Sequence, residues 1–95
     1  MTDIIYTNVA SDHTVKPTQT KFTNSTGKDI TLRFENGTDL FIEDGATSEK
    51  TSKTIQSINY GAEYYYSAHQ NNYTIDAGKT ATIERSGSNL VMKIP

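Results

Sequence analysis

The chain of 95 residues contains no cysteine. Disulfide bonds and cysteine-based metal sites are therefore excluded, and the redox compartment stays open. Long apolar runs are also missing, since the N-terminal stretch MTDIIYTNVASD has an acidic residue at position 3 and at most three adjacent apolar residues. This start predicts neither a secretory signal nor a membrane span, so we expect synthesis in the cytoplasm, with a virion as a further candidate location.

Basic charge is scarce as well. Nine Lys and Arg residues stand against eleven Asp and Glu residues, which gives a formal net charge of −2, and the basic residues form no cluster. Proteins that bind nucleic acid through the phosphate backbone need a basic patch or stripe. Nucleic acid is therefore not expected among the partners.

Strongly apolar side chains are few, because Val, Ile, Leu and Phe number only 18 of the 95 residues. A proportion near one fifth is close to the level of disordered chains, but those also carry high net charge. The residues that are abundant suit a pleated sheet: fifteen Thr, nine Ile against three Leu, and six Tyr. We therefore expect an all-β chain with a single thin core.

Alternating apolar and polar residues predict where the strands lie. The clearest signal is the segment DITLRFE at 29–35. Further strands are expected at 40–42, 63–68, 73–75, 80–85 and 90–94, with a weaker one at 4–6. Residues 43–53 are polar and are expected to form a loop or a charged edge strand. One helical turn around Ile55 and Ile58 is a less favoured alternative, because Thr and Ser are poor helix formers.

The Asn-Gly pair at 36–37 predicts a hairpin whose register can be argued. A three-residue loop ending at Gly37, in the left-handed conformation, places Leu32 opposite Leu40 and keeps Ile42 on the same buried face. A two-residue loop would move both apolar residues to the polar face. The preferred register leaves Phe41 pointing outward.

The last hairpin is predicted around a two-residue turn at Ser86-Gly87. This turn places Ile83 opposite Leu90 and Ala81 opposite Met92. All four side chains then lie on one face.

Short strands separated by turn signals predict a small immunoglobulin-like antiparallel β-sandwich of about 7 to 8 strands. The stretch FTNSTGKDITLRFENG followed by TIDAGKTATI resembles the layout of bacterial immunoglobulin-like modules and is similar to the intracellular proteinase-inhibitor domain family of bacilli. The resemblance consists mainly of turn residues. It implies the fold alone, because the aromatic-rich inhibitory loops of that family have no match here.

Residues 8–20 contain only three apolar side chains and a proline, too few to hold a packed element. We therefore expect residues 1–19 to form an extended N-terminal arm and residues 20–95 to form the sandwich. The arm is expected to add a strand to the sheet edge of another chain. The predicted partner-binding residues are Ile4, Ile5, Tyr6 and Phe41.

A cluster of tyrosines is the most informative feature. Tyr combines apolar area with a polar tip, which suits stacking on a glycan or packing at a protein interface. The predicted ligand-binding residues are Tyr64, Tyr65, Tyr66 and Tyr73. The alternative is that Tyr64, Tyr66 and Tyr73 fill a thin core while Tyr65 is merely exposed.

Catalytic signals are weak. His13 and His69 lie outside any recognisable motif, and the adjacent Glu43 and Asp44 would point to opposite faces of a strand. No spaced Asp/Asn loop of the EF-hand type is present. We expect no enzyme activity, no catalytic residue, no metal site and no cofactor.

Three functions remain open from the sequence. The first is a non-catalytic structural or interaction module, an accessory subunit of a larger assembly such as a virion decoration or tail component, docked by its N-terminal arm to other protein chains or to itself. The second is a glycan-binding β-sandwich that uses the Tyr cluster. The third is a small inhibitor or immunity-type protein that presents a loop at residues 44–53.

Overall fold

The computed structural model describes all residues 1–95 and consists of strands and loops only. It contains no helix, and hence none that is long and apolar enough to cross a membrane. The ten strands are β1 (Thr2–Thr7), β2 (Val15–Lys16), β3 (Lys21–Ser25), β4 (Ile30–Phe34), β5 (Asp39–Ile42), β6 (Ile55–Tyr60), β7 (Glu63–Ser67), β8 (Tyr73–Thr74), β9 (Thr80–Ser86) and β10 (Asn89–Ile94). The predicted all-β class is confirmed.

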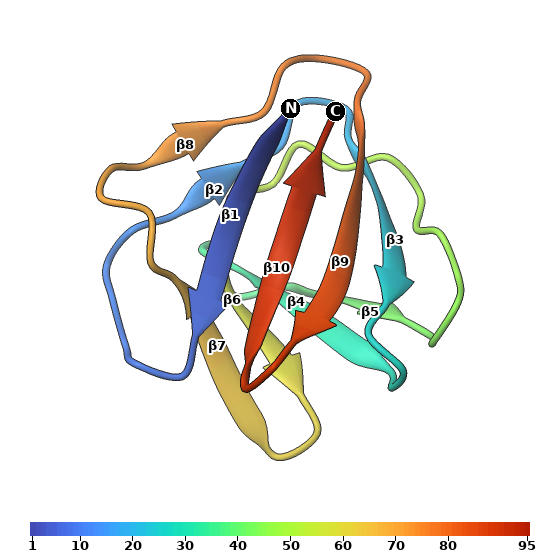
Figure 1. Cartoon of the computed structure of the whole chain (residues 1–95). Coiled ribbons are helices and arrows are strands. Elements are labelled where there is room, and N and C mark those ends of the chain that lie inside the picture. Colours follow the sequence, from blue (N-terminus) through green and yellow to red (C-terminus); the bar gives the residue numbers. More distant parts are fainter.

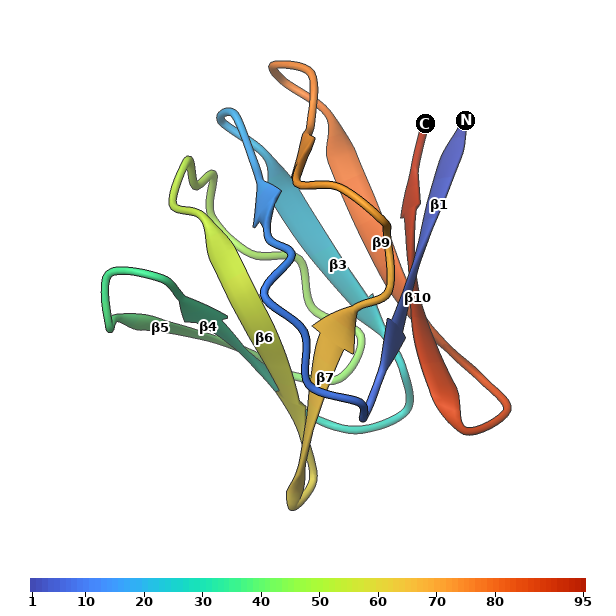
Figure 2. The same cartoon turned by 90° about the vertical axis from the view of Figure 1, so that its left-hand side faces the viewer.

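All ten strands belong to one open, mixed sheet that bends over on itself (Figures 1 and 2). One layer contains β3, β9, β10 and β1 in that order, and the other contains β5, β4 and β6. Strand β7 joins the layers, because it pairs with β1 on one side and with β6 on the other. The space between the layers is filled by one cluster of 18 buried hydrophobic residues.

The expected purely antiparallel sandwich of 7 to 8 strands is corrected in two respects. The sheet has ten strands, and two of its pairs are parallel: β3 with β9, and β2 with β8. Alternation along a strand indicates which face is buried but not which strand lies beside it. The partners in each parallel pair lie far apart in the sequence, so no hairpin turn marks them.

The expected arm at residues 1–19 is also corrected, because this segment belongs to the packed domain. Strand β1 lies between β10 and β7. Ile4 and Tyr6 are each 1% exposed and belong to the core cluster, as does Val15 of β2. The segment has few apolar residues, but these three are buried against strands that are distant in the sequence. A count of local apolar residues therefore underestimated it.

The hairpin of β4 and β5 has the predicted register. Leu32 pairs with Leu40, and Ile30 pairs with Ile42. Gly37 has a φ angle of 88°, which is the left-handed conformation that the three-residue loop requires. Phe41 is 58% exposed and points outward, as predicted.

The register of the hairpin of β9 and β10 is shifted by two residues from the prediction. Met92 pairs with Ile83, and Leu90 pairs with Arg85. The turn is Gly87-Ser88, and Gly87 has a φ angle of 60°. Because side chains alternate with a period of two, a shift of two residues keeps the same side chains on the buried face. The predicted face is therefore correct although the predicted pairs are wrong.

Residues 43–54 form a loop that covers the outer edge of β3. The backbone N–H of Ser48 donates to the carbonyl of Phe22 at 2.8 Å, and Thr51 and Thr20 exchange two backbone hydrogen bonds. Covering a strand edge in this way protects it from pairing with other chains. Ile55 and Ile58 lie in β6 rather than in a helical turn, so the strand alternative is confirmed.

Candidate binding site

The outer face of the second layer carries rows of side chains that are set by the registers of β5, β4, β6 and β7. One row consists of Phe41, Thr31, Asn59 and Tyr64. The next row contains Asp39, Arg33 and Ser57. Tyr66 follows Tyr64 by two positions on β7, so it projects from the same face. These side chains point away from the core.

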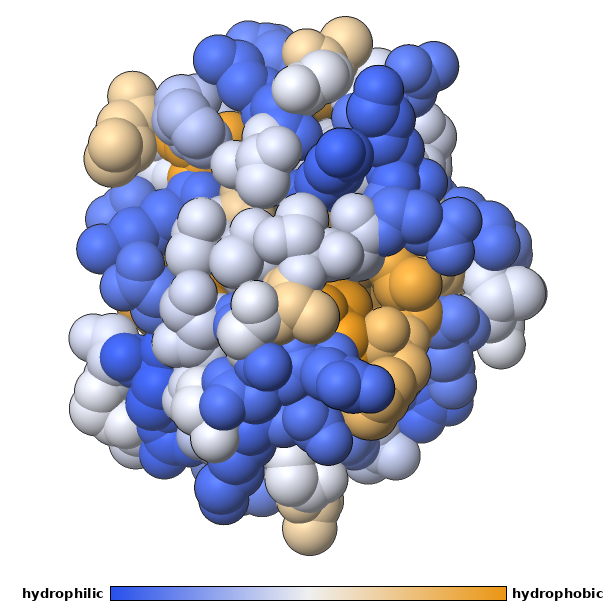
Figure 3. All heavy atoms as spheres, turned by 90° about the vertical axis from the view of Figure 1, so that its right-hand side faces the viewer, coloured by the Kyte–Doolittle hydropathy of each residue, from blue (hydrophilic) through white to orange (hydrophobic).

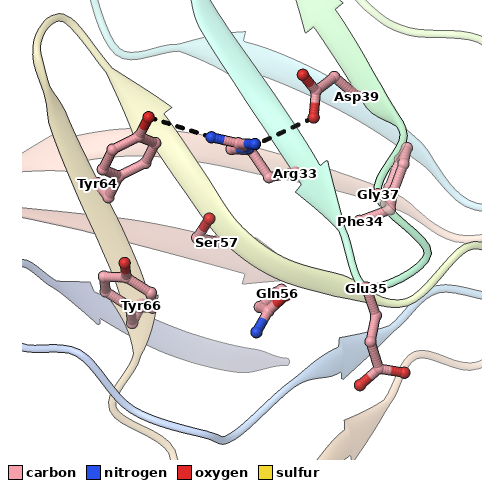
Figure 4. A pocket seen from close by; sticks show the side chains of 9 residues that line it. All are labelled: Arg33, Phe34, Glu35, Gly37, Asp39, Gln56, Ser57, Tyr64 and Tyr66. Atoms are coloured by element: carbon pink, nitrogen blue, oxygen red, sulfur yellow. Dashed lines mark hydrogen bonds and ion pairs between the residues drawn. The ribbon is translucent and has the colours of Figure 1, made fainter.

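This face is hollowed between β4, β6 and β7 (Figure 4). The open depression has a volume of about 400 Å³, within the range of about 300 to 1,000 Å³ that is usual for ligand sites. The residues that line it are Arg33, Phe34, Glu35, Gly37, Asp39, Gln56, Ser57, Tyr64 and Tyr66. Two tyrosine rings form one side, and the charged side chains of β4, its loop and β5 form the other.

A β-bulge shapes the depression. Ser57 pairs with Arg33, whereas the next pair is Ile55 with Phe34, so Gln56 is left without a partner. An extra residue of this kind bends the strand and changes the direction of its side chain. Gln56 is exposed at the margin of the depression as a result.

Arg33 is held from two sides. Its Nε lies 3.5 Å from Oδ1 of Asp39, and its Nη1 donates a hydrogen bond of 3.1 Å to the phenol oxygen of Tyr64. The guanidinium carbon is 5.4 Å from the centroid of the Tyr64 ring. A guanidinium has five N–H donors, so these contacts leave three of them free for a ligand. The planar group is thus oriented before anything binds.

Ser57 lies at the floor of the depression, in the middle of the polar and aromatic side chains in Figure 4. The residue is 6% exposed, yet its hydroxyl makes no hydrogen bond with the rest of the chain. Its Oγ is not fully buried, because the hydroxyl of Tyr6 is the only buried side-chain polar atom without a partner, so water reaches Ser57 in the unbound protein. The Ser57 hydroxyl is therefore available to a bound molecule.

The four predicted tyrosines do not lie together in one site. Tyr64 is 42% exposed and Tyr66 is half-buried, and both line the depression. Tyr65 is 1% exposed and packs edge-on against Tyr60 in the core, with ring centroids 6.0 Å apart. Tyr65 is therefore not a surface residue. The alternative, in which Tyr65 is exposed and its neighbours fill the core, is wrong because it assigns the alternating side chains to the opposite faces of β7.

Tyr73 lies away from the depression, in β8. Its ring packs edge-on against that of His69 at 5.5 Å, and its hydroxyl is 3.4 Å from Oγ1 of Thr2. Nδ1 of His69 in turn lies 2.8 Å from the carbonyl oxygen of Asn71. These contacts hold the β8 segment against β1, and they do not bring Tyr73 to the other tyrosines.

The predicted partner-binding residues are divided as well. Ile4 and Tyr6 are buried and cannot contact a partner, which corrects that part of the prediction. Ile5 is 40% exposed, on the outer side of the first layer. Phe41 lies in the same row as Tyr64 and is exposed on the same sheet face, but it does not line the depression.

Five polar residues of the site were not found from the sequence: Arg33, Glu35, Asp39, Gln56 and Ser57. The alternation of β4 places Arg33 on the outer face, and the hairpin register then places Asp39 beside it. These two could have been found. The position of Gln56 and Ser57 depends on the bulge in β6, for which the sequence carries no signal.

The remaining predicted features were located too. The loop at residues 44–53 is bonded along β3 rather than projecting from the domain, which does not suit a presented inhibitory loop. No group of three or more His, Asp or Glu side chains is placed to hold a metal ion.

The fold and the site together define a two-layer β domain with a ligand-sized depression on one sheet face. Comparison with family models, with curated proteins and with solved structures finds no match to this chain. The likeness to bacterial immunoglobulin-like modules therefore rests on turn residues alone.

Proposed function

We propose that this chain is a non-catalytic glycan-binding module and that sugars bind in the depression beside Tyr64 and Tyr66. The observation that carries the proposal is the placement of two tyrosine rings next to the oriented Arg33–Asp39 pair on one sheet face. A sugar ring has apolar C–H faces and an edge of hydroxyl groups. Aromatic rings pack against the former, and a small number of placed polar groups bind the latter.

The carboxylates of the site support binding rather than glycoside hydrolysis. A hydrolase needs a pair of carboxyl groups, one of which is kept protonated by an apolar or like-charged environment. Glu35 is exposed, and the side chain of Asp39 is 51% exposed and lies against Arg33. Open, solvated and paired carboxylates suit hydrogen bonding to hydroxyl groups.

A glycan array followed by calorimetric titration of the strongest hits tests this proposal. The variants Tyr64→Ala and Tyr66→Ala are expected to bind about fivefold more weakly or worse, because each removes a stacking surface of about 1 kcal/mol or more. Phe41→Ala is the matched control, since Phe41 is an exposed aromatic on the same face but outside the depression. Equal affinity of Tyr64→Ala and the unchanged protein would contradict the proposal.

A second candidate is an interaction module in a larger assembly, such as a virion decoration or tail component. Phe41 is exposed on β5, and β5 pairs only with β4, which leaves an open strand edge. Figure 3 views the molecule from the side of β3 and shows a mainly hydrophilic surface, with an apolar area on the side of the β4–β5 layer. An open edge with an exposed aromatic suits the addition of a strand from another chain or a second copy.

Sedimentation of the purified chain at increasing concentration distinguishes the two candidates. Self-association that Phe41→Ala abolishes, with glycan binding absent, would favour the assembly role. On either candidate the fold is proposed to be a variant of the immunoglobulin-like sandwich in which β3 and β9 pair in parallel. Residues 1–19 do not serve as the docking segment in this second candidate, because β1 lies between two strands of its own sheet.

A further inference from the structure

We infer that the depression selects uncharged sugars and discriminates against sugars that carry a carboxylate or sulfate group. This inference rests on the proposed glycan-binding function and names its ligand class. It follows from two independent features of the depression: its charge and its unpaired hydrogen-bonding groups.

The charged side chains that line the depression are Glu35, Asp39 and Arg33. Arg33 is the one cation among them, and Asp39 lies 3.5 Å from its Nε. Glu35 has no ion-pair partner within reach. An anionic ligand therefore meets an unopposed carboxylate while the guanidinium charge is already offset, and such like-charge placement weakens binding.

A further cation, Lys53, lines a smaller neighbouring hollow of about 160 Å³. Its Nζ lies 5.7 Å from the ring centroid of Phe34 and 3.5 Å from Oγ1 of Thr38. Lys53 does not line the larger depression. It therefore offers no direct contact to a ligand beside Tyr64 and Tyr66.

The unpaired polar groups match hydroxyl groups. The hydroxyl of Ser57 makes no hydrogen bond within the chain, and Arg33 retains three free N–H donors. Gln56 adds an amide that both donates and accepts at the margin. A sugar hydroxyl can accept from the N–H groups of Arg33, and it can either donate to or accept from Ser57 and Gln56.

The test compares matched ligands that differ only in charge: a neutral hexose disaccharide found on the array, and the same disaccharide with a uronic acid or a sulfate ester. Titration calorimetry of the full chain is expected to show about tenfold weaker binding of the charged forms. Glu35→Gln is expected to reduce this ratio severalfold. Glu84→Gln is the matched control, because it makes the same change of net charge on the other layer, where Glu84 lies 3.4 Å from Lys93.

Ser57→Ala is a second variant, expected to weaken binding of the neutral disaccharide severalfold without lowering the Tm. Acidic disaccharides that bind as tightly as neutral ones, and that lose affinity in Tyr64→Ala, would overturn the inference and leave the glycan-binding function standing. If Glu35→Gln and Glu84→Gln change the ratio of neutral to charged affinity equally, the inference would likewise be overturned and the glycan-binding function would stand. Absence of binding to any glycan would remove the proposed function and the inference with it.

Discussion

Arg33 and Tyr64 meet above strand β6, where Nη1 of Arg33 donates to the phenol oxygen of Tyr64 at 3.1 Å. Their strands, β4 and β7, do not pair with each other, since each pairs with a different edge of β6. The contact therefore spans three strands, and Ser57 of β6 lines the same depression. One consequence is that the shape of the depression depends on a single exposed side-chain pair.

Removing the Tyr64 hydroxyl should affect binding more than stability. Tyr64→Phe keeps the ring but deletes the acceptor for Arg33, so we expect severalfold weaker binding of a neutral glycan. The free energy of unfolding should fall by no more than about 1 kcal/mol, because hydrogen bonds between exposed groups contribute little. Calorimetric titration and urea denaturation of the same variant measure the two effects. A large loss of stability without a change in affinity would mean that the contact is structural.

The hydroxyl of Tyr6 is buried and has no hydrogen-bond partner. Its removal in Tyr6→Phe loses no hydrogen bond and relieves a desolvation penalty, so we expect an unchanged or higher free energy of unfolding, by up to about 1 kcal/mol at neutral pH. Urea denaturation measures it. A loss of more than about 1 kcal/mol would show that the hydroxyl has a partner, such as an internal water.

Burial raises the pKa of Tyr6 well above its usual value. Above a pH of about 10 the unfolded chain can ionise this phenol and the folded chain cannot, so the unfolded state binds fewer protons and stability falls as the pH rises. Denaturation at pH 7 and pH 11 should therefore show a smaller loss for Tyr6→Phe than for the unchanged chain. Identical losses in the two proteins would contradict this assignment.

Two Asn-x-Thr segments allow a matched comparison of buried and exposed turns. Oδ1 of Asn24 accepts from the backbone N–H and the hydroxyl of Thr26, at 3.0 and 2.7 Å, and Oδ1 of Asn36 accepts from Thr38 at the same distances. Asn24 is fully buried, and its Nδ2 also donates to the carbonyl of Ile42 at 3.0 Å.

Asn24→Ala should therefore lower the free energy of unfolding by about 2 to 4 kcal/mol, since it leaves buried groups without partners. Asn36→Ala should cost less than about 1 kcal/mol, because water replaces the lost contacts. Equal losses in a denaturant titration would show that the network around Asn24 does not contribute as the geometry indicates.

The N-terminal strand offers a comparison of neighbouring residues. Ile4 is 1% exposed, whereas Ile5 is 40% exposed. We expect Ile4→Ala to lower the free energy of unfolding by about 2 to 5 kcal/mol and Ile5→Ala to lower it by less than about 1 kcal/mol. Thermal unfolding of the two variants measures this difference. Similar small losses would mean that β1 does not belong to the core.

The register of a hairpin could be predicted where the buried face and the turn residue allow only one pairing of the two strands. In the β4–β5 hairpin, only the register through Gly37 buries both Leu40 and Ile42. In the β9–β10 hairpin, two registers separated by two residues bury the same side chains, so the pattern alone could not choose between them.

Other features depend on contacts that are distant in the sequence. Three consecutive tyrosines carry no alternation, and the choice of Tyr65 as the buried one is made by its pairing with Ile58 in β6. Burial of Ile4 likewise depends on the pairing of β1 with β10. The candidate site was predicted in part, as Tyr64 and Tyr66, while the polar residues beside them follow from the bulge and the strand order.

Both proposals about the ligand depend on the binding of a glycan in the depression between Tyr64, Tyr66 and Arg33. The most direct measurement is a nuclear magnetic resonance titration of the isotope-labelled chain with a neutral oligosaccharide selected on an array. If a glycan binds there, we expect chemical-shift changes confined to residues 33–39, 56–57 and 64–66, and we expect the same changes to be absent in Tyr66→Ala. Changes centred on β8 or on β1, or no changes at millimolar ligand, would contradict it.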